Sequence, residues 1–279
     1  MHMVCLSFDF DALSGWIARG MTTPTPISRG EFGAVGADRI LGLLKRMEVP
    51  ATWFIPGHTL ETYPEVCKRV LDAGHKIGHH GWTHRPPQSL TREEEEQELI
   101  RGNQEIQSLT GRAARGYRSP SWDLSPHSIE LLIEHGFTYE SSMMANDFTP
   151  YRARRGDVIE LHRPAAFGAS TRLIEMPVSW SLDDYPHFEF VRTPSTVLPG
   201  LMNANGVLAN WIDDFLYMKR ETGWGVLTYT FHPFVIGRGH RMLMLERLVE
   251  RLRAEGAEFV AMETAAARYD ERAPFKAAR

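Results

Sequence analysis

The sequence predicts an α/β fold, a distorted (β/α) barrel of seven or eight units. Short apolar runs typical of buried strands alternate with amphipathic helical segments along the chain. This alternation indicates parallel strands joined by helices. The 279 residues contain no linker, sequence repeat or low-complexity segment, so a single domain over 1–279 is expected. An open doubly wound sheet is the alternative, because periodicity alone does not separate the two.

The expected strands share a short apolar run that ends at a polar residue or a turn. β-branched and aromatic residues are common in them, as the segment VLTYTF illustrates. In chain order the expected strands are 4–8, 51–55, 76–79, 114–117, 137–140, 158–161, 173–178, 226–231 and 258–261.

The expected helices share an apolar face that recurs every three to four residues. The clearest start is at Thr91, which forms a capping-box pattern with Glu94, and the same helix ends before Gly111. In chain order the expected helices are 38–47, 61–73, 91–110, 125–136, 207–221 and 241–254.

An irregular insert at about 145–205 interrupts this alternation. Six prolines are scattered through it: Pro150, Pro164, Pro177, Pro186, Pro194 and Pro199. Long loops inside a compact domain are often functional, so we expect a lid or a subunit contact here.

The composition is that of a soluble globular protein, and it argues against several classes. Acidic residues outnumber basic ones by 35 to 31, which argues against a nucleic-acid partner. No apolar run of about 18 residues is present, so no membrane partner is expected. The first residues lack a secretory signal pattern, and a cytoplasmic location is therefore expected. Cys5 and Cys67 lie in apolar contexts and are expected to be buried free thiols.

Polar side chains follow four of the expected strands at the point where each strand ends. In chain order they are Asp9, Asp11, His79, His80, His84, Arg118 and His232. Active sites of parallel βα folds lie at the carboxyl ends of the strands, so we expect these side chains to converge on one rim. That convergence is the main evidence for an active site.

The pair His80 and His84 has a spacing that can place two imidazoles on one metal ion. The spacing alone is weak evidence, because His75 and His79 share it, and purely structural histidines are the alternative. A carboxylate from another strand end strengthens the metal hypothesis, since two histidines and one aspartate leave coordination positions open for water and substrate.

The aspartates Asp9 and Asp11 lie on the same side of an extended segment, and Phe10 points away from them. One carboxylate could bind a metal while the other acts as a base. The alternative is an aspartate pair that caps the turn after the strand.

The segments SFDFDA, HHGWTH, GYRSPSWD and TFHPF, in this order and spacing, resemble the motifs of the polysaccharide deacetylase family, also called carbohydrate esterase family four. The resemblance extends over about 4–261. It implies a distorted (β/α) barrel and metal-dependent hydrolysis of amide-type carbon–nitrogen bonds other than peptide bonds.

The resemblance also assigns roles to individual residues. It implies that Asp9 is the catalytic base, that Arg118 braces this base, and that His232 is the general acid. The metal ligands that it implies are Asp11, His80 and His84. His75 and His79 then keep structural roles.

The sequence departs from the usual family pattern at two places. Phe10 separates aspartates that are adjacent in most members, and the usual Asp–Trp pair is reduced to SW at 179–180. These features resemble a branch that contains cyclic imidases, peptidoglycan deacetylase-like proteins and, more distantly, allantoinases. That branch implies a homo-oligomer, a tetramer or dimer. Asp183 and Asp184 are both candidates to orient His232.

The candidate residues support one hydrolytic mechanism. Zinc or another divalent ion would polarise the scissile carbonyl and bind the attacking water. Asp9 would take a proton from that water and His232 would protonate the leaving nitrogen, which predicts a bell-shaped pH profile. A backbone N–H near Ser121 or Trp122 would stabilise the oxyanion. Three tryptophans are expected to bind the substrate: Trp82, Trp122 and Trp180.

Three functions are compatible with these residues. The first is hydrolysis of cyclic imides or related small ring amides, which the expected cytoplasmic location favours. The alternative is N-deacetylation of peptidoglycan or another glycan that contains N-acetylglucosamine. A non-catalytic sugar- or metal-binding barrel would not need both a base and an acid. We therefore expect a metal-dependent hydrolase of a small-molecule or glycan substrate, with cyclic imides placed first.

Overall fold

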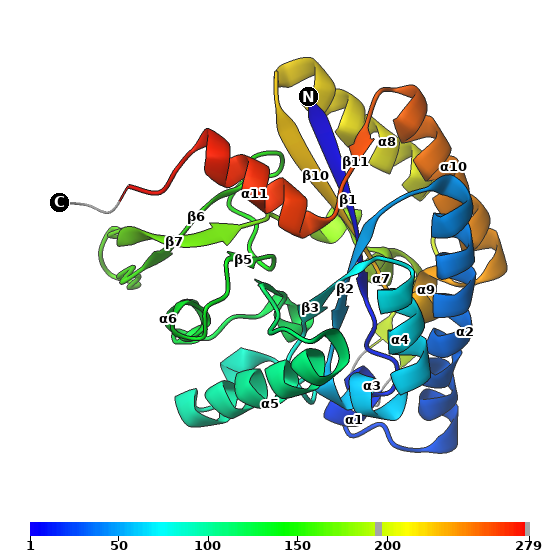
Figure 1. Ribbon diagram of the computed structural model, residues 1–279, viewed down its shortest axis with the longest axis horizontal. Helices are drawn as coiled ribbons and strands as arrows, with labels where there is room; N and C mark the ends of the chain where they lie inside the picture. The colour runs from blue at the N-terminus through cyan, green and yellow to red at the C-terminus, as the bar shows by residue number, and fades with distance from the viewer. Residues whose placement is uncertain (193–196, 277–279) are drawn as a thin grey trace.

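A curled sheet of mostly parallel strands forms the centre of the protein, and helices cover its outer side (Figure 1). The structure is a computed structural model that describes residues 1–192 and 197–276. The strands are β1 (His2–Asp9), β2 (Ala51–Ile55), β3 (Lys76–His79), β4 (Gly116–Tyr117), β5 (Tyr139–Glu140), β6 (Tyr151–Arg155), β7 (Ala169–Glu175), β8 (Val191–Arg192), β9 (Val197–Leu198), β10 (Gly225–Phe231) and β11 (Glu258–Phe259).

The helices alternate with these strands through most of the chain. They are α1 (Ser14–Ala18), α2 (Pro24–Met47), α3 (Gly57–Thr62), α4 (Pro64–Asp72), α5 (Arg92–Thr110), α6 (Ser128–Glu134), α7 (Asp184–Phe188), α8 (Ala204–Glu221), α9 (Pro233–Ile236), α10 (Gly239–Ala254) and α11 (Met262–Arg272).

The order of strands in the large sheet is β10-β1-β2-β3-β4-β5-β7-β6, and β11 pairs with β1. In this sheet only β6 runs antiparallel to its neighbour. From β1 to β5 the strands lie side by side in chain order, whereas a doubly wound sheet reverses its order near the middle. Within the described residues the two edge strands, β10 and β6, do not pair, so the sheet is a curled half-barrel. The predicted distorted barrel is confirmed.

Alternation along β1 sorts its side chains between two cores. Val4, Leu6 and Phe8 pack under the outer helices. Met3 and Cys5 point into the curl of the sheet, where α11 packs its buried face against them. Toward the carboxyl end the inner positions become polar at Ser7 and Asp9, so the inside of the curl changes from an apolar layer to the layer that carries the site. Cys5 and Cys67 are buried free thiols, as expected.

Several element boundaries differ from those expected. Helix α2 begins at Pro24, fourteen residues before the expected start, and a first-turn proline marks that beginning. The helix expected at 61–73 is divided into α3 and α4 at Pro64, which cannot continue a helix. Helices α1 and α11 were not predicted. The capping box of α5 is confirmed, with Glu94 N–H donating to Thr91 Oγ1 over 3.2 Å.

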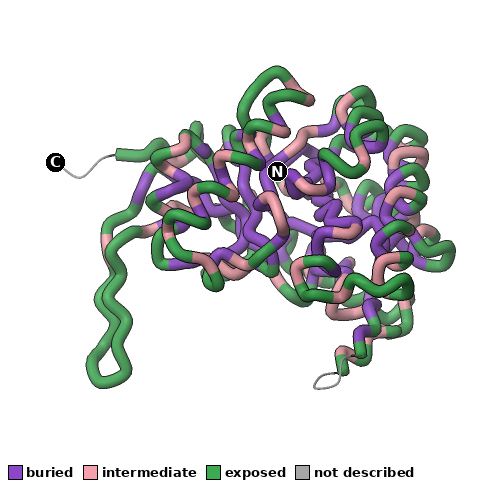
Figure 2. Tube along the Cα trace, turned by 90° about the horizontal axis from the view of Figure 1, so that it is seen from below, coloured by how far each residue is buried: buried purple, intermediate pink, exposed green. Residues whose placement is uncertain are grey.

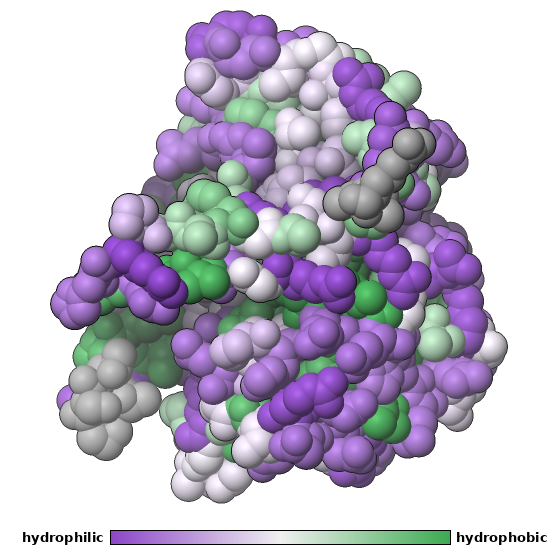
Figure 3. Space-filling model, turned by 90° about the vertical axis from the view of Figure 1, so that its left-hand side faces the viewer, coloured by the Kyte–Doolittle hydropathy of each residue, from purple (hydrophilic) through white to green (hydrophobic). Residues whose placement is uncertain are grey.

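The insert contributes β6, β7, α7 and a projecting hairpin at 156–168. The strand expected at 158–161 is wrong: only one bridge, between Val158 and Ala166, forms there, and Leu161 is 91% exposed. The projection is visible as an exposed excursion in Figure 2. On the face shown in Figure 3, hydrophilic side chains predominate and apolar ones lie chiefly in recesses. Among the described residues, no helix is both long and apolar enough to cross a bilayer.

Candidate active site

The predicted residues meet in one small cavity at the carboxyl ends of the strands. Its volume is about 100 Å³. Its lining residues are Asp9, Asp11, Arg19, His80, His84, Ser121, Trp122, Trp180, Asp183, Tyr185 and His232. The convergence expected from the strand ends is therefore present in the structure.

Asp11, His80 and His84 form a compact set of buried donor atoms. Their ligand atoms lie within 4.8 Å of one another. The Nε2 atoms of His80 and His84 are 3.4 Å and 3.3 Å from the two carboxylate oxygens of Asp11. His80 Nδ1 is 2.7 Å from the carbonyl oxygen of Arg118, which places the proton on Nδ1 and leaves the Nε2 lone pair facing Asp11.

This donor set fits a divalent metal ion. Asp11 Oδ1 is buried and has no hydrogen-bond partner among the described residues, an arrangement that is costly unless a cation compensates it. Two imidazoles and a carboxylate suit zinc and its neighbours in the first transition row. Burial raises the pKa of Asp11, but the neighbouring His84 and His80 outweigh it and hold that pKa well below its usual value. Asp11 is therefore ionised and ready to bind a cation.

Asp9 is held by Arg118 beside this set. Arg118 Nη1 donates to Asp9 Oδ1 and to Ser7 Oγ, each over 2.8 Å. The Arg118 side chain is fully buried, and it also donates to the backbone and the hydroxyl of Ser141. The second carboxylate oxygen, Asp9 Oδ2, lies 4.0 Å from His80 Nε2. Arg118 thus fixes one oxygen of Asp9 and leaves the other facing the cavity.

A buried carboxyl pair, which was not predicted from the sequence, holds Ser142, and Ser142 contacts the residue that follows Arg118. Glu140 on β5 and Glu175 on β7 both accept the Ser142 N–H, each over 3.1 Å. Ser142 Oγ donates to Glu140 and accepts the N–H of Ser119, the residue after Arg118. Burial, together with the neighbouring Glu140 carboxylate, raises the pKa of Glu175 well above its usual value. A proton shared between Glu140 and Glu175 avoids two buried negative charges side by side.

Replacing Glu175 with glutamine is expected to stabilise the protein increasingly as pH rises. The pKa of Glu175 is raised on folding, so its contribution to stability is full below the unfolded pKa and is lost as pH rises through the folded value. At alkaline pH the free energy of unfolding of the variant is expected to exceed that of wild type by roughly 1 kcal/mol or more. A pKa shift of one unit corresponds to about 1.4 kcal/mol. Thermal unfolding between acid and alkaline pH measures it. A constant difference between variant and wild type would contradict the assignment.

His232 follows β10 and faces the metal set from the other side. Its Nδ1 is 2.8 Å from Asp184 Oδ1, and its Nε2 is 3.8 Å from Asp11 Oδ2. Asp183 is more distant, at 3.5 Å from Nδ1, and it caps α7 by accepting the Tyr185 N–H. Asp184 is therefore the residue that orients His232, which answers the question that the sequence left open.

The two aspartates keep His232 protonated. Burial lowers the pKa of His232, but the charges of Asp183 and Asp184 and the hydrogen bond to Asp184 outweigh it and raise that pKa well above its usual value. Burial raises the pKa of Asp183 to about 7. At neutral pH His232 can thus donate a proton from Nε2 into the cavity.

The Asp184→Asn variant is expected to lose activity at a lower pH on the alkaline side than wild type. A general acid fails as pH rises through its pKa, and removing the Asp184 charge lowers the pKa of His232. We also expect kcat to fall roughly 10- to 100-fold, because the imidazole loses its orienting partner. The pH profile of kcat measures both effects. The control, Asp183→Asn, keeps the α7 cap and should shift the alkaline limb of the pH profile with a smaller loss of kcat. An unchanged alkaline limb in Asp184→Asn would contradict the role of His232.

Two of the three predicted tryptophans line the cavity. Trp122 and Trp180 stack with their ring centroids 4.3 Å apart. Trp82 does not lie in this cavity: its indole packs between Gly57 and Arg101, whose guanidinium lies 3.1 Å from the ring centroid. Gly81 and His84 both have positive φ, of 68° and 62°, in the segment where His84 lines the cavity and Trp82 does not.

The backbone at Ser121 and Trp122 adopts a left-handed conformation, with φ of 58° and 54°. Such strain in residues other than glycine is typical of functional sites. The Trp122 N–H donates to the carbonyl oxygen of Ser119 over 3.0 Å. Of the two donors predicted for the oxyanion, the Ser121 N–H is therefore the candidate.

His75 and His79 do not line the cavity. Gly81 N–H donates to His79 Nδ1 over 3.0 Å, and His79 Nε2 lies 3.1 Å from the Leu99 carbonyl oxygen. Burial lowers the pKa of His79 to about 3, so this imidazole is neutral. His75 is buried at the amino end of β3, away from the site.

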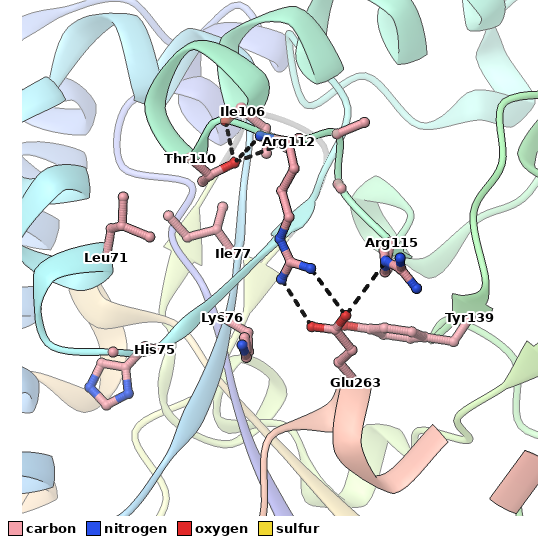
Figure 4. Close-up of a pocket in the computed structure, with 14 residues that line it drawn as sticks. Leu71, His75, Lys76, Ile77, Ile106, Thr110, Arg112, Arg115, Tyr139 and Glu263 are labelled. Atoms are coloured by element: carbon pink, nitrogen blue, oxygen red, sulfur yellow. Dashed lines mark hydrogen bonds and ion pairs between the residues drawn. The ribbon is translucent and has the colours of Figure 1, made fainter. Parts of the chain in front are cut away.

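A larger cavity, of about 330 Å³, lies at the amino ends of the strands (Figure 4). Arg112 and Arg115 both pair with Glu263 across it. It contains none of the residues that converge at the carboxyl ends. The small cavity, not this one, therefore has the groups that hydrolysis requires.

Comparisons with known proteins identify the family to which the chain is similar. The family model described as Polysaccharide deacetylase matches residues 31–140. A peptidoglycan deacetylase of Helicobacter pylori is 38% identical, and the alignment covers 98% of each chain. A crystal structure from Mycobacterium smegmatis, assigned to the polysaccharide deacetylases, has a TM-score of 0.86 at 29% identity and covers 100% of this chain and 94% of the other. An allantoinase shares the fold, with a TM-score of 0.77 at 20% identity over 99% and 91% of the two chains.

By fold and by site the protein is a hydrolase of carbon–nitrogen amide bonds, of the class that depends on a divalent metal. The chain belongs to the polysaccharide deacetylase family.

Proposed function

We propose that the protein is an N-deacetylase of peptidoglycan amino sugars. The observation that carries the proposal is the convergence of a base, a metal-ligand set and an acid on one cavity. The similarity to the Helicobacter pylori peptidoglycan deacetylase supports it, because it extends over nearly the whole chain. The sequence placed cyclic imides first, and this full-length similarity moves the deacetylase ahead of them.

In the proposed mechanism each of these residues has a task in hydrolysis of an N-acetyl group. Asp11, His80 and His84 would hold a divalent cation, which would supply Lewis-acid polarisation of the scissile carbonyl. Asp9 Oδ2 accepts a proton from the attacking water, while Arg118 holds Oδ1. The Ser121 N–H donates to the developing oxyanion.

Collapse of the tetrahedral intermediate requires a proton on the leaving nitrogen. His232 Nε2 donates this proton, and Asp184 holds the imidazole through Nδ1. Trp122 and Trp180 form an apolar wall that keeps bulk water from the acetyl group. The products are acetate and a free amine.

A second candidate function is ring-opening of a small cyclic amide. The observation that favours it is the small volume of the cavity, about 100 Å³, which fits a compact ring better than a long glycan. The catalytic groups would act in the same way on either substrate.

We propose zinc as the metal. The cytoplasmic location and the oligomeric state, a tetramer or dimer, stay predictions.

One NMR experiment separates the two functions. The zinc-loaded protein is incubated with succinimide, hydantoin and an N-acetylglucosamine oligomer in the same sample. Acetate without ring-opened product supports the deacetylase. Ring-opened acid amide without acetate supports the cyclic-amide hydrolase and overturns the main proposal.

A further inference from the structure

A positively charged side chain, Arg19, lines the active-site cavity and is not used by the proposed mechanism. It follows the last residue of α1 and is exposed. Its Nη1 donates to the Tyr185 hydroxyl over 2.9 Å, and its guanidinium lies 5.6 Å from the Tyr185 ring centroid and 5.8 Å from that of Trp16. Two aromatic rings and one neutral hydroxyl thus hold it at the cavity.

Arg19 differs from the neighbouring arginines in its charge partner. Arg118 pairs with Asp9. Arg29, which also lies against Trp16, pairs with Glu189. Within 1–192 and 197–276, the structure shows no carboxylate paired with Arg19. Its charge is therefore available to a ligand in the cavity.

The position of Arg19 assigns it to one side of the substrate. Tyr185, which binds the guanidinium, also packs against His232, with ring centroids 5.3 Å apart. His232 is the proposed donor to the leaving nitrogen. Arg19 therefore lies on the amine side of the scissile amide, not on the acyl side.

We propose that Arg19 selects substrates that carry a carboxylate on the amine side of the scissile amide. The inference rests on the proposed deacetylase function and names its substrate class: N-acetylated muramic-acid-type sugars. In these sugars a lactyl ether with a carboxylate occupies the ring carbon next to the one that bears the N-acetyl group. A guanidinium binds a carboxylate through two parallel hydrogen bonds.

The other charges of the site already have partners, which leaves Arg19 to bind a substrate carboxylate. Asp9 pairs with Arg118, His232 pairs with Asp184, and Asp11 would pair with a bound cation. A glucosamine-type sugar has no group that Arg19 can pair with, and it gains nothing from the contact.

The test compares N-acetylmuramic acid with its methyl ester, a pair that differs only in the charge of the lactyl group. Acetate release is measured by NMR for wild type, Arg19→Gln and Arg19→Lys. Wild type is expected to prefer the acid by roughly 10- to 100-fold in kcat/KM, the size of a charge-assisted pair. Arg19→Gln should bring the ratio near one, and Arg19→Lys should keep part of it because the charge remains.

A matched control is Arg238→Gln. Arg238 also stacks on an aromatic ring, with its guanidinium 3.5 Å from the Phe32 centroid, but it does not line the cavity. The preference for the acid should be unchanged in this variant. A kcat/KM ratio of acid to ester near one in wild type, or a ratio that is unchanged in Arg19→Gln, overturns the inference. Acetate release by wild type supports the proposed function in either case.

Binding gives a second readout that does not depend on turnover. Calorimetry measures the affinity of the metal-loaded Asp9→Asn protein for N-acetylmuramic acid and for its ester, with and without Arg19→Gln. Tighter binding of the acid that disappears with Arg19→Gln supports the inference. Equal binding of both compounds overturns it. If neither compound releases acetate from wild type, the deacetylase proposal fails, and this binding comparison still decides the role of Arg19.

Discussion

The Asp9→Asn variant is expected to lose activity by roughly 10²- to 10⁴-fold in kcat, the range for loss of a general base. Asparagine has nearly the same shape, and its amide oxygen can still accept from Arg118. Its amide nitrogen cannot accept a proton from water. Turnover with saturating substrate measures the loss, and metal content measured on the same sample shows that the ligand set is intact. Normal turnover in this variant would rule out Asp9 as the base.

A stability measurement accompanies this variant, because Arg118 is fully buried. Removing the Asp9 charge leaves a buried guanidinium without its counter-charge, which is expected to lower the free energy of unfolding by about 3–5 kcal/mol. Ser7→Ala is the matched control. It removes the other Nη1 contact of Arg118 but keeps the carboxylate. This control should be destabilised less and should retain most of its turnover.

Removal of the divalent metal is expected to abolish activity, by roughly 10³-fold or more, and readdition should restore it. The estimate follows from the several kcal/mol that a metal contributes to the charge developed in the transition state. The melting temperature should also fall, because an ion that binds only the folded state stabilises it. Activity and melting temperature after dialysis against a chelator measure both effects.

The structure contains a second group with metal-ligand chemistry, Asp183, Asp184 and His232, so the location of the ion must be tested. There the hydrogen bonds of His232 already satisfy Asp184, whereas Asp11 Oδ1 has no partner. We expect Asp11→Asn and His84→Gln to lose the metal and Asp184→Asn to retain it, as measured by elemental analysis. Full metal content in Asp11→Asn would contradict the proposed ligand set.

The sequence allowed most of the candidate site to be predicted, because that part depends on strand ends. Asp9, Asp11 and His232 directly follow or end buried apolar runs, and parallel strands bring such positions to one edge. The alternation around Phe10 also holds: its ring packs against Trp53, while both aspartates line the cavity.

The parts that could not be predicted depend on contacts between distant segments. In the sequence Glu140 and Glu175 look like ordinary surface residues. They are buried because β5 pairs with β7, which places the two side by side. The choice of Asp184 over Asp183 depends on the turn that begins α7 and on the bridge between Asp183 and Thr230. Trp82 lies outside the cavity in a segment where Gly81 and His84 both have positive φ, which a motif does not reveal.

The fold was predicted less well where the alternating pattern fades. Helix α11 buries only a small face, at Met262, Ala265 and Ala266, and its sequence has no long apolar periodicity. The hairpin at 156–168 contains apolar residues that read as a strand, but its side chains are exposed and its strands pair at a single bridge. Helix α11 and this hairpin therefore differ in how far their apolar residues are buried, which composition does not show.

The central strand β1 has consequences for how the chain folds during synthesis. It pairs with β10 and β11, and the hydrogen bond from Ser7 Oγ to the Tyr229 carbonyl oxygen joins residues 222 positions apart. A newly made chain therefore exposes the apolar strand β1 until β10 and β11 have been synthesised. High contact order of this kind slows folding and prolongs exposure to aggregation. The site at the end of β1 is thus among the last parts of the molecule to be assembled, although Asp9 is made before all of its other residues.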